Sequence, residues 1–302
     1  MAVEKLAELF KLLRGKPVKT IVVVCANDEH SISAVNLAVE KKLVRGVLIG
    51  DESLMLSASR ETGIDLRRFT IIHQPSDDLA ARLAVEMINL GEGDILMKGL
   101  ISTDKFMRAI LNKEKGITEP GKVVSHVTIV ENKNYHKLLI VADVAVIPLP
   151  DLNQKVQIIN YLVGVAHRLK IELPKIAVIA PSEQVIPSIL STTDAALLAK
   201  MGDRGQIKGC IIDGPLALDV AIDPEAVAIK GIKSPVAGDA DCLLFPNLES
   251  GNVFYKVNTK LAESESAAIM VGARVPVVLA SRGDTTQVKL HSIALAALLA
   301  HD

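Results

Sequence analysis

The sequence contains no tryptophan, and Phe, Trp and Tyr together make up only 3% of its residues. Proteins that bind single-stranded nucleic acid stack the bases on aromatic side chains, so this scarcity argues against that class. The formal net charge is −1, from 34 basic and 35 acidic residues, whereas binding to DNA phosphates needs a concentrated excess of Lys and Arg. The composition therefore gives no indication of a nucleic-acid partner.

Long hydrophobic runs and paired cysteines are also lacking. No apolar stretch approaches the roughly 20 residues of a membrane-spanning helix, and the opening MAVEKLAELFKLLRGK is typical of an amphipathic helix rather than a signal peptide. Cys25, Cys210 and Cys242 each stand alone in an apolar, strand-like run without C-x-x-C spacing, which favours buried, unreactive thiols. We therefore expect a cytoplasmic protein with no membrane partner.

Short β-branched runs alternate with helical patterns along the whole chain. At 302 residues the chain exceeds what one hydrophobic core usually supports, so we expect two domains. Continuous apolar strands between helices indicate an α/β fold with mainly parallel sheets flanked by helices. The predicted strands are 20–25, 46–49, 69–73, 94–97, 175–179, 209–212, 242–245, 268–271 and 275–279, and the predicted helices include 31–43, 77–90, 103–113, 152–169 and 249–263.

One segment interrupts this alternation. Residues 125–130 and 137–141 flank the turn-like ENKNYH, which predicts an antiparallel hairpin. The Pro148-Leu149-Pro150-Asp151 segment that follows marks a domain boundary. We therefore expect residues 1–147 plus 271–302 to form the first α/β domain, and residues 148–270 to form a second, inserted α/β domain.

Polar residues gather where predicted strands end. Open α/β sheets bind ligands outside the carboxyl ends of their strands, and strand 94–97 is followed by Lys98, Ser102 and Thr103, with Arg108 inside the next helix. A cation, hydroxyl groups and a helix N-terminus together indicate an anion site. The alternative is that Thr103 is simply the N-cap and Arg108 a surface residue.

A second polar group lies in the predicted helix 249–263. Gly251 lies inside a helical pattern, where glycine costs about 1 kcal/mol relative to alanine, so either a ligand or tight helix packing needs a close approach there. Asn252 and Lys256 are four residues apart and share a helix face.

The third group is Ser281-Arg282-Gly283-Asp284, between the apolar strand 275–279 and the closing helix. The forked guanidinium of Arg282 suits a phosphate bidentately. Asp284 is expected in the first turn of the closing helix, where it either caps the helix or takes part in catalysis.

Signals for metals and nucleotide cofactors are weak. Asp239 and Asp241 form a possible magnesium pair, although a turn before a strand is the alternative. The seven histidines never reach zinc-ligand spacing, and the GxGxxG and GxxxxGK[ST] fingerprints are absent. We therefore expect no metal and no tightly bound cofactor.

The chain resembles the phosphate acetyl/butyryltransferase family, and within it the phosphate butyryltransferase branch. The segments that carry the resemblance are MKGLISTDKFMRAIL, SHVTIVE, MGDRGQIKGCIIDGPLALDVA, KSPVAGDADCLLFPNLESGNVFYK and VPVVLASRGDTTQVKLHSIALA. The resemblance implies two α/β domains similar to isocitrate and isopropylmalate dehydrogenases, with the active-site cleft between them. It also implies interconversion of acyl-CoA plus phosphate with acyl phosphate plus CoA, by a homodimer or larger homo-oligomer.

The resemblance also implies roles for single residues. Ser281 and Arg282 match the pair that binds the phosphoryl group and the reacting carbonyl. The other matches are Thr103 and Arg108 in a loop of the first domain, and Asn252 and Lys256 in a G-N-x-x-x-K segment.

This sequence departs from the acetyl branch at one position that matters. The acetyltransferases carry an aspartate, taken as the base for the CoA thiol, seven residues after the serine that matches Ser281. Val288 stands there in this chain, and the nearest carboxylate is Asp284, as in the butyryl branch. Three alternatives stay open: a phosphate acetyltransferase, a metal-dependent oxidative decarboxylase, and a non-catalytic acyl-CoA-binding regulatory module.

Overall fold

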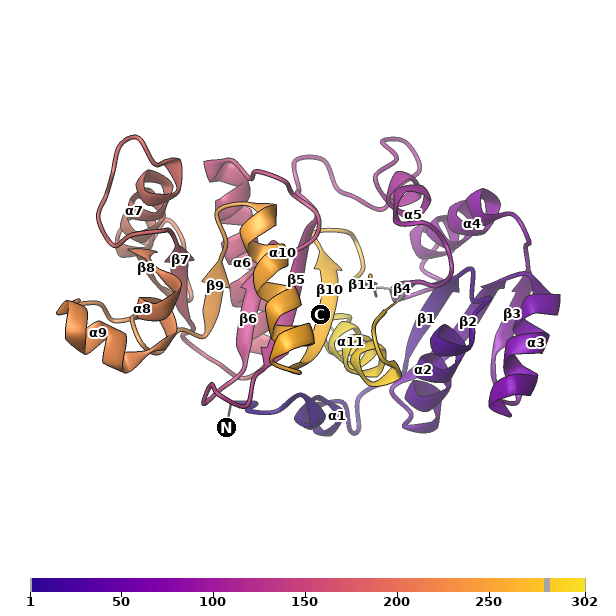
Figure 1. Ribbon diagram of the computed structural model, residues 1–302. Helices are drawn as coiled ribbons and strands as arrows, with labels where there is room; N and C mark the ends of the chain where they lie inside the picture. The colour runs from indigo at the N-terminus through magenta and orange to yellow at the C-terminus, as the bar shows by residue number, and fades with distance from the viewer. Residues whose placement is uncertain (1, 280–282, 302) are drawn as a thin grey trace. The chain divides into compact units, whose positions relative to one another are not determined.

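A computed structural model describes residues 2–279 and 283–301 (Figure 1). The chain forms two compact units: unit 1 comprises Met1–Leu6 and Ser125–Ser266, and unit 2 comprises Ala7–Val124 and Ala267–Asp302. The predicted boundary at residue 148 assigns the hairpin 125–141 to the first domain, whereas this hairpin packs with the residues that follow it, in unit 1. Both units are α/β, with mostly parallel strands flanked by helices.

Unit 2 contains a parallel sheet with the strand order β3-β2-β1-β4-β11, and β10 pairs antiparallel with β11. The central strand β1 is buried on both faces from Ile21 to Val24, which explains why its sequence is continuously apolar. The bounds are β1 (Lys19–Val24), β2 (Val44–Gly50), β3 (Thr70–His73), β4 (Ile95–Lys98), β10 (Glu265–Val271, of which 267–271 belong to unit 2) and β11 (Val277–Val278).

The helices of unit 2 form two groups. In the first, α2 packs between α3 and α11, and in the second, α4 packs against α5. Their bounds are α2 (Glu29–Glu40), α3 (Glu52–Thr62), α4 (Asp77–Asn89), α5 (Thr103–Ile110) and α11 (Thr286–Leu299). The predicted N-terminal amphipathic helix is reduced to a 3-10 turn, η1 (Leu6–Glu8), and one helical turn, α1 (Leu9–Leu12); a second 3-10 turn is η2 (Leu66–Arg68).

Unit 1 begins with the predicted antiparallel hairpin, which is confirmed: Thr128 pairs with Val141 and Val130 with Leu139. The strands β6, β9, β7 and β8 then follow in parallel, and their inward side chains form a core around Val141, Ala177 and Leu243. The bounds are β5 (Ser125–Glu131), β6 (Leu139–Ala142), β7 (Lys175–Ile179), β8 (Ile211–Leu216) and β9 (Cys242–Leu244).

The helices of unit 1 start at side-chain caps where the sequence supplies them. Asp151 and Gln154 form a capping box on α6, and the Asn247 side chain caps α10 through the Ser250 amide. The predicted helix 249–263 is divided into α10 and a π-helical turn, η3. The bounds are α6 (Leu152–Arg168), α7 (Leu190–Asp203), α8 (Leu218–Ile222), α9 (Pro224–Lys230), α10 (Leu248–Lys256) and η3 (Val257–Leu261).

Two predicted strands are misplaced. Strand 209–212 is β8 at Ile211–Leu216, because Gly209 has a φ of 77°, outside the β region, and lies in a bend with Cys210. Cys210 is therefore half-buried outside the strand, whereas Cys25 and Cys242 are buried as predicted. Strand 275–279 is only Val277–Val278, because Pro276 has no amide hydrogen for a ladder hydrogen bond. Among the described residues, no helix is both long and apolar enough to cross a membrane.

Candidate functional site

The strand order of unit 2 reverses between β1 and β4, and this is the point where open α/β sheets bind ligands, outside the carboxyl ends of the strands. The loops that leave these two strands are joined by backbone hydrogen bonds from Gly99 N to Val24 O (2.8 Å) and from Leu100 N to Cys25 O (2.7 Å). A Cβ atom at position 99 would lie 2.4 Å from the Cys25 carbonyl oxygen. Only glycine fits there, so the loops after β1 and β4 pack closely against each other.

Lys98, a predicted substrate-binding residue, is the last residue of β4 and lies where these two loops begin. Its side chain is buried, with only 5% of the residue exposed, and its Nζ donates to the Gly99 carbonyl at 3.3 Å. A buried ammonium group at the carboxyl edge of the sheet makes this edge favourable for anions.

Ser102 and Thr103 lie at the start of α5, directly after the loop that leaves β4. The alternative in which Thr103 is the N-cap is wrong, because Ser102 has the extended backbone of a cap and its hydroxyl accepts a hydrogen bond from Lys105 N at 3.3 Å. Thr103 is the first helical residue, and both side chains are exposed. Two hydroxyl groups thus stand at the positive end of a helix dipole.

A chain of contacts that the sequence analysis did not identify joins the loop after β1 to α4 and α5. The Cys25 thiol donates to Asp77 Oδ1 at 3.6 Å, and Lys105 Nζ lies 3.0 Å from Asp77 Oδ2. Burial, and then the Asp77 carboxylate, raise the pKa of Cys25 to about 12, so the thiol stays protonated. The hydrogen bond to Asp77 raises the pKa of Lys105. The contacts fix the start of α5 relative to the sheet.

Arg108 lies on the outer surface of α5. Its guanidinium pairs with Asp104, one turn earlier, and about 72% of its side chain is exposed. It follows Thr103 by five positions, so the two residues lie on different faces of the helix. The structure therefore places Arg108 in an exposed ion pair, and its predicted role in substrate binding stays a prediction.

The last strand, β11, ends at the same edge of the sheet as β4. β11 is parallel to β4, with Val278 beside Met97, so the chain leaves both strands in the same direction. Ser281 and Arg282, the predicted catalytic pair, lie outside the described residues.

Asp284 precedes the closing helix and is not part of it. The expectation that it lies in the first helical turn or caps the helix is wrong, because Thr285 is the N-cap of α11 and its hydroxyl accepts a hydrogen bond from Val288 N at 3.2 Å. Asp284 itself is half-buried.

Unit 1 contains a buried carboxylate, Asp143, that the sequence analysis did not identify. Asp143 follows β6 and is 2% exposed. Its carboxylate accepts hydrogen bonds from Ser125 Oγ (2.9 Å) and from the amides of His126 (3.1 Å), Ala145 (2.8 Å), Val146 (2.8 Å) and Ile147 (3.3 Å). One buried carboxylate thus fixes the loop after β6 to the start of β5. The sequence signal is a lone acid between two apolar runs.

The predicted substrate-binding residues of unit 1 lie on α10, which packs on this loop. A Cβ atom at position 251 would lie 2.2 Å from the Asp143 carbonyl oxygen, so tight packing explains Gly251. The Asn252 amide donates to Val144 O at 3.1 Å. Lys256, one turn later, is exposed, with its Nζ 5.0 Å from the centre of the Tyr255 ring. Asn252 therefore holds α10 against the loop, while Lys256 faces solvent.

The possible magnesium pair is an ion-pair network. Asp239 binds Lys137, Lys175 and His136, and Asp241 also binds Lys137, at 2.7–2.8 Å. Burial opposes ionisation of Asp239, but these hydrogen bonds prevail and lower its pKa. Across residues 2–279 and 283–301, no group of three or more His, Cys, Asp or Glu side chains is arranged to hold a metal ion.

Comparison with known proteins adds full-length matches. Residues 78–297 match the family model described as "Phosphate acetyl/butaryl transferase". The chain is 44% identical to a phosphate butyryltransferase of Clostridium acetobutylicum over 97% of both chains. It is 42% identical to a phosphate acetyltransferase of Thermotoga maritima, over 99% of this chain and 100% of that protein. The crystal structure of a branched-chain phosphotransacylase from Enterococcus faecalis V583 superimposes with a TM-score of 0.82 at 27% identity, covering 94% of this chain and 99% of that one.

Proposed function

Because the chain belongs to the phosphate acetyl/butyryl transferase family, we propose that it is a phosphate acyltransferase that interconverts a short-chain acyl-CoA plus phosphate with an acyl phosphate plus CoA. The observation that carries this proposal is the 44% identity to a phosphate butyryltransferase over nearly the whole of both chains. The preferred acyl group is about four carbons long, straight or branched. The reaction uses no tightly bound cofactor.

The reaction makes modest chemical demands. A phosphate oxygen attacks the thioester carbonyl carbon, a C–O bond forms, the C–S bond breaks, and the departing CoA thiolate takes up a proton. The protein must bring two anions together and stabilise charge on the carbonyl oxygen. In this proposal Arg282 neutralises the phosphate with its bidentate fork, and Ser281 hydrogen-bonds the transferring group.

Three further residues of unit 2 contribute to anion binding in this proposal. Support comes from the buried Lys98 at the end of β4 and from the exposed Ser102 and Thr103 at the start of α5. A buried cation and a helix N-terminus act in the same direction on a phosphate. Arg108 would bind substrate only after exchanging Asp104 for a substrate phosphate.

Asn252 and Lys256 of unit 1 also bind substrate in this proposal. Lys256 supplies a positive charge, and Asn252, which holds α10 on the loop after β6, sets the position of that charge. We also infer that the two units are the two domains of an isocitrate/isopropylmalate dehydrogenase-like fold, so that both contribute residues to one reaction.

In the reverse direction, where CoA attacks the acyl phosphate, the base that accepts the thiol proton does not need to be strong. A thiol with a pKa of about 8.5 needs only about 2 kcal/mol to ionise at pH 7. Asp284, which follows the catalytic pair, suffices if it orients Arg282 or a water molecule that accepts the proton.

The proposal is tested by measuring thiol release from acetyl-, butyryl- and isobutyryl-CoA, each with and without inorganic phosphate. We expect phosphate-dependent thiol release that is fastest with the four-carbon substrates. Acetyl-CoA should still react, more slowly, because a pocket discriminates only about 10- to 200-fold per methylene. Strict acetyl specificity would make the chain a phosphate acetyltransferase. Binding of acyl-CoA without any thiol release would support a regulatory module instead.

A further inference from the structure

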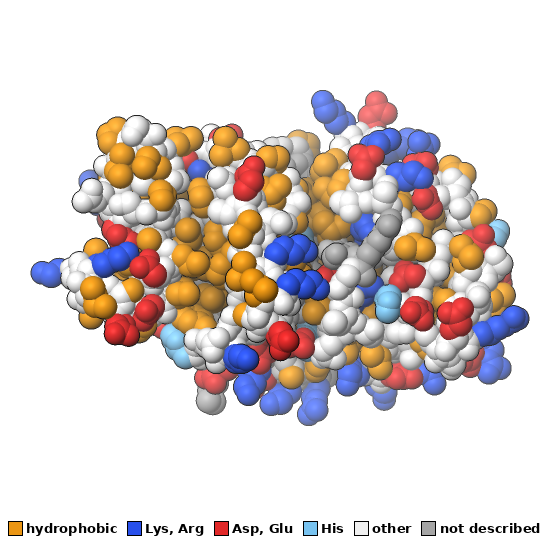
Figure 2. Space-filling view, in the orientation of Figure 1, with side chains coloured by type: hydrophobic (Ala, Val, Ile, Leu, Met, Phe, Trp, Pro, Cys, Tyr) orange, Lys and Arg blue, Asp and Glu red, His pale blue; other side chains and the backbone are white. Residues whose placement is uncertain are grey.

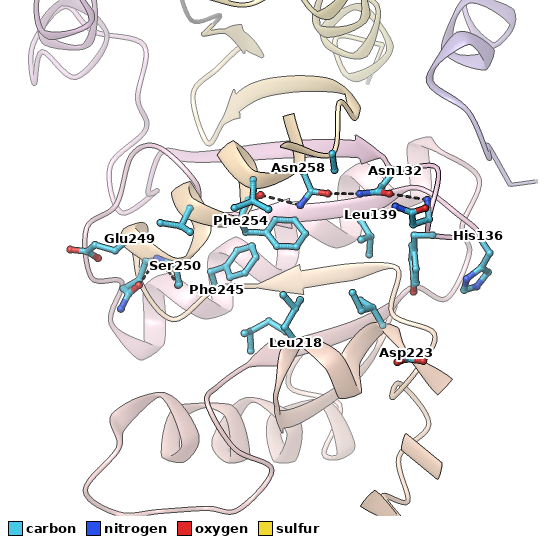
Figure 3. Close-up of a pocket in the computed structure, with 18 of the residues that line it drawn as sticks. Asn132, His136, Leu139, Leu218, Asp223, Phe245, Glu249, Ser250, Phe254 and Asn258 are labelled. Atoms are coloured by element: carbon cyan, nitrogen blue, oxygen red, sulfur yellow. Dashed lines mark hydrogen bonds between the residues drawn. The ribbon is translucent and has the colours of Figure 1, made fainter. Parts of the chain in front are cut away.

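The open groove of unit 1 is a poor site for phosphate. It measures about 1100 Å³, and none of the described residues that line it is a lysine or an arginine. Figure 2 shows hydrophobic side chains exposed over this part of unit 1, and Figure 3 shows Leu218, Phe245 and Phe254 directed into the groove. The carboxyl edge of the unit 2 sheet differs, because the Lys98 ammonium group is buried there. An anion is therefore favoured at that edge.

At this edge, Asp77 connects three segments that are distant in sequence. One of its carboxylate oxygens accepts a hydrogen bond from the Cys25 thiol at 3.6 Å, and the other accepts one from Lys105 Nζ at 3.0 Å. Cys25 follows β1, Asp77 is the first residue of α4, and Lys105 lies in the first turn of α5. Asp78 lies farther from the same ammonium group, at 3.9 Å. Asp77 therefore links the start of α5 to the sheet.

The backbone of Cys25 has a conformation that residues with a side chain rarely adopt. Its φ is 54°, in the left-handed region. In this conformation its carbonyl oxygen accepts a hydrogen bond from Leu100 N at 2.7 Å, while its thiol donates to Asp77. Strained backbone is concentrated at sites where the surrounding structure fixes functional groups in place. Cys25 thus holds both the loop that leads into α5 and the carboxylate that binds Lys105.

The first turn of α5 carries groups that bind the anion in the proposed function. The Lys105 backbone amide donates to Ser102 Oγ at 3.3 Å, so the residue whose side chain binds Asp77 also takes part in the helix cap. A displacement of Lys105 would therefore move Ser102, Thr103 and the amide groups at the start of the helix. The direction of these groups decides how well they bind a phosphate.

Charge alone would make Asp77 unfavourable at a phosphate site, because a carboxylate repels a nearby phosphate. The pair with Lys105 is also partly solvated, since the two side chains are 39% and 35% exposed, and such pairs add little to stability. Neither electrostatic attraction of substrate nor stability of the fold explains the carboxylate. The position of α5 does.

We propose that Asp77 is a positioning residue of the phosphate site, acting through Lys105 and Cys25 to hold the first turn of α5 at the carboxyl edge of the sheet. The inference rests on the proposed function, which makes this turn part of the phosphate site. It predicts an effect opposite to that of charge: removal of the carboxylate weakens phosphate binding, although it removes a repelling group.

The test measures the dissociation constant of inorganic phosphate from the rise in unfolding temperature with phosphate concentration, and the KM for phosphate in the thiol-release assay. Asp77→Asn and Lys105→Met should each raise both constants about tenfold and leave kcat within about twofold, because they disturb binding and not the reacting groups. The double variant should be no worse than either single one, since both changes break the same link. Lys105→Arg should stay close to wild type, because arginine can still bind Asp77.

Asp94→Asn is the matched control in the same unit. Asp94 lies at the opposite edge of the sheet, where its carboxylate accepts from Lys19 Nζ at 3.1 Å and from Thr20 N at 2.8 Å. The Lys19 and Asp94 side chains are 24% and 37% exposed, so this pair resembles the Asp77 pair in length and exposure. The control variant should keep the wild-type constants for phosphate.

Three results would overturn the inference: unchanged or tighter phosphate binding in Asp77→Asn, equal weakening in Asp77→Asn and Asp94→Asn, or additive losses in the double variant. The proposed function fails in a different way. A protein that binds phosphate with the expected order of variants but releases no thiol would contradict the proposed function and support the role of Asp77.

Discussion

At the residue scale, Asp284 can be tested without interference from helix capping, because Thr285 is the cap of α11. We predict that Asp284→Asn lowers turnover by about 100-fold or more, the range of acid–base assistance, while the protein stays folded. Thr285→Ala is the control: it should cost about 1 kcal/mol of stability and keep turnover near the wild-type value. Normal turnover in Asp284→Asn would remove the carboxylate from the mechanism.

Arg282 provides the second residue-scale prediction. Arg282→Lys should lower kcat by about 100-fold, comparable to the loss of one donor to a developing charge, because an ammonium group cannot reproduce a bidentate fork. Steady-state kinetics with varied phosphate measure the effect, and thermal unfolding checks that the fold is intact. Near-normal kinetics would contradict the assignment of Arg282 to the phosphate.

Single polar residues were only partly predictable from the sequence. Lys98 and Ser102 could be found because they follow an apolar strand, and strand ends are where α/β sheets bind ligands. The sequence does not show whether Ser102 or Thr103 is the N-cap, because both have a suitable side chain and only the backbone angles distinguish them. Asp143 and Asp77 were not identified because their hydrogen-bond partners are distant in sequence. Asp143 accepts from Ser125, and Asp77 accepts from Cys25.

At the scale of elements, α6 and α7 are joined by a buried ion pair. Lys155 Nζ lies 2.5 Å from Asp194 Oδ2, and the side chains are only 3% and 10% exposed. We predict that Lys155→Met destabilises the fold by about 3–5 kcal/mol, because it leaves a buried carboxylate without its partner. Lys155→Met combined with Asp194→Leu should recover most of this loss in urea unfolding. A double variant no more stable than the single one would show that the charge pair itself stabilises the fold.

The closing helix α11 carries a buried histidine that makes stability depend on pH. His291 is 4% exposed, and burial lowers its pKa from 6.5 to about 4. Between these values the unfolded chain binds the proton and the folded chain does not, so stability falls by about 3 kcal/mol as the pH drops from about 6.5 to 4. Above pH 6.5 this contribution is constant. In His291→Leu, the free energy of unfolding measured in urea should depend less on pH between about 6.5 and 4. An unchanged pH dependence would show that His291 is not its cause.

Elements were predicted best where pattern and turn chemistry agree. The hairpin β5–β6 was predicted because two β-branched runs flank a short polar turn. The strand β8 was placed too early because Gly209 and Cys210 read as part of an apolar run, although they form a bend. The break between α10 and η3 was not predictable, since helical spacing continues through it.

At the scale of the whole molecule, the alternation of strands and helices was enough to predict the α/β class. The boundary was placed at residue 148 on local Pro and Asp signals. However, the hairpin before it packs with unit 1, because membership of a unit depends on long-range packing that local turn residues do not encode. The function was predictable because motifs of one family follow one another in order along nearly the whole chain.

The central claim is that this chain transfers an acyl group between CoA and phosphate, and the most direct measurement identifies the phosphorus-containing product. Butyryl-CoA and inorganic phosphate are incubated with the purified protein and followed by ³¹P NMR, with free thiol measured in parallel. The account predicts a butyryl phosphate signal that grows in equal amount to the released CoA, and no signal with Arg282→Lys on the same time scale. Release of CoA without an acyl phosphate, or no release at all, would contradict it.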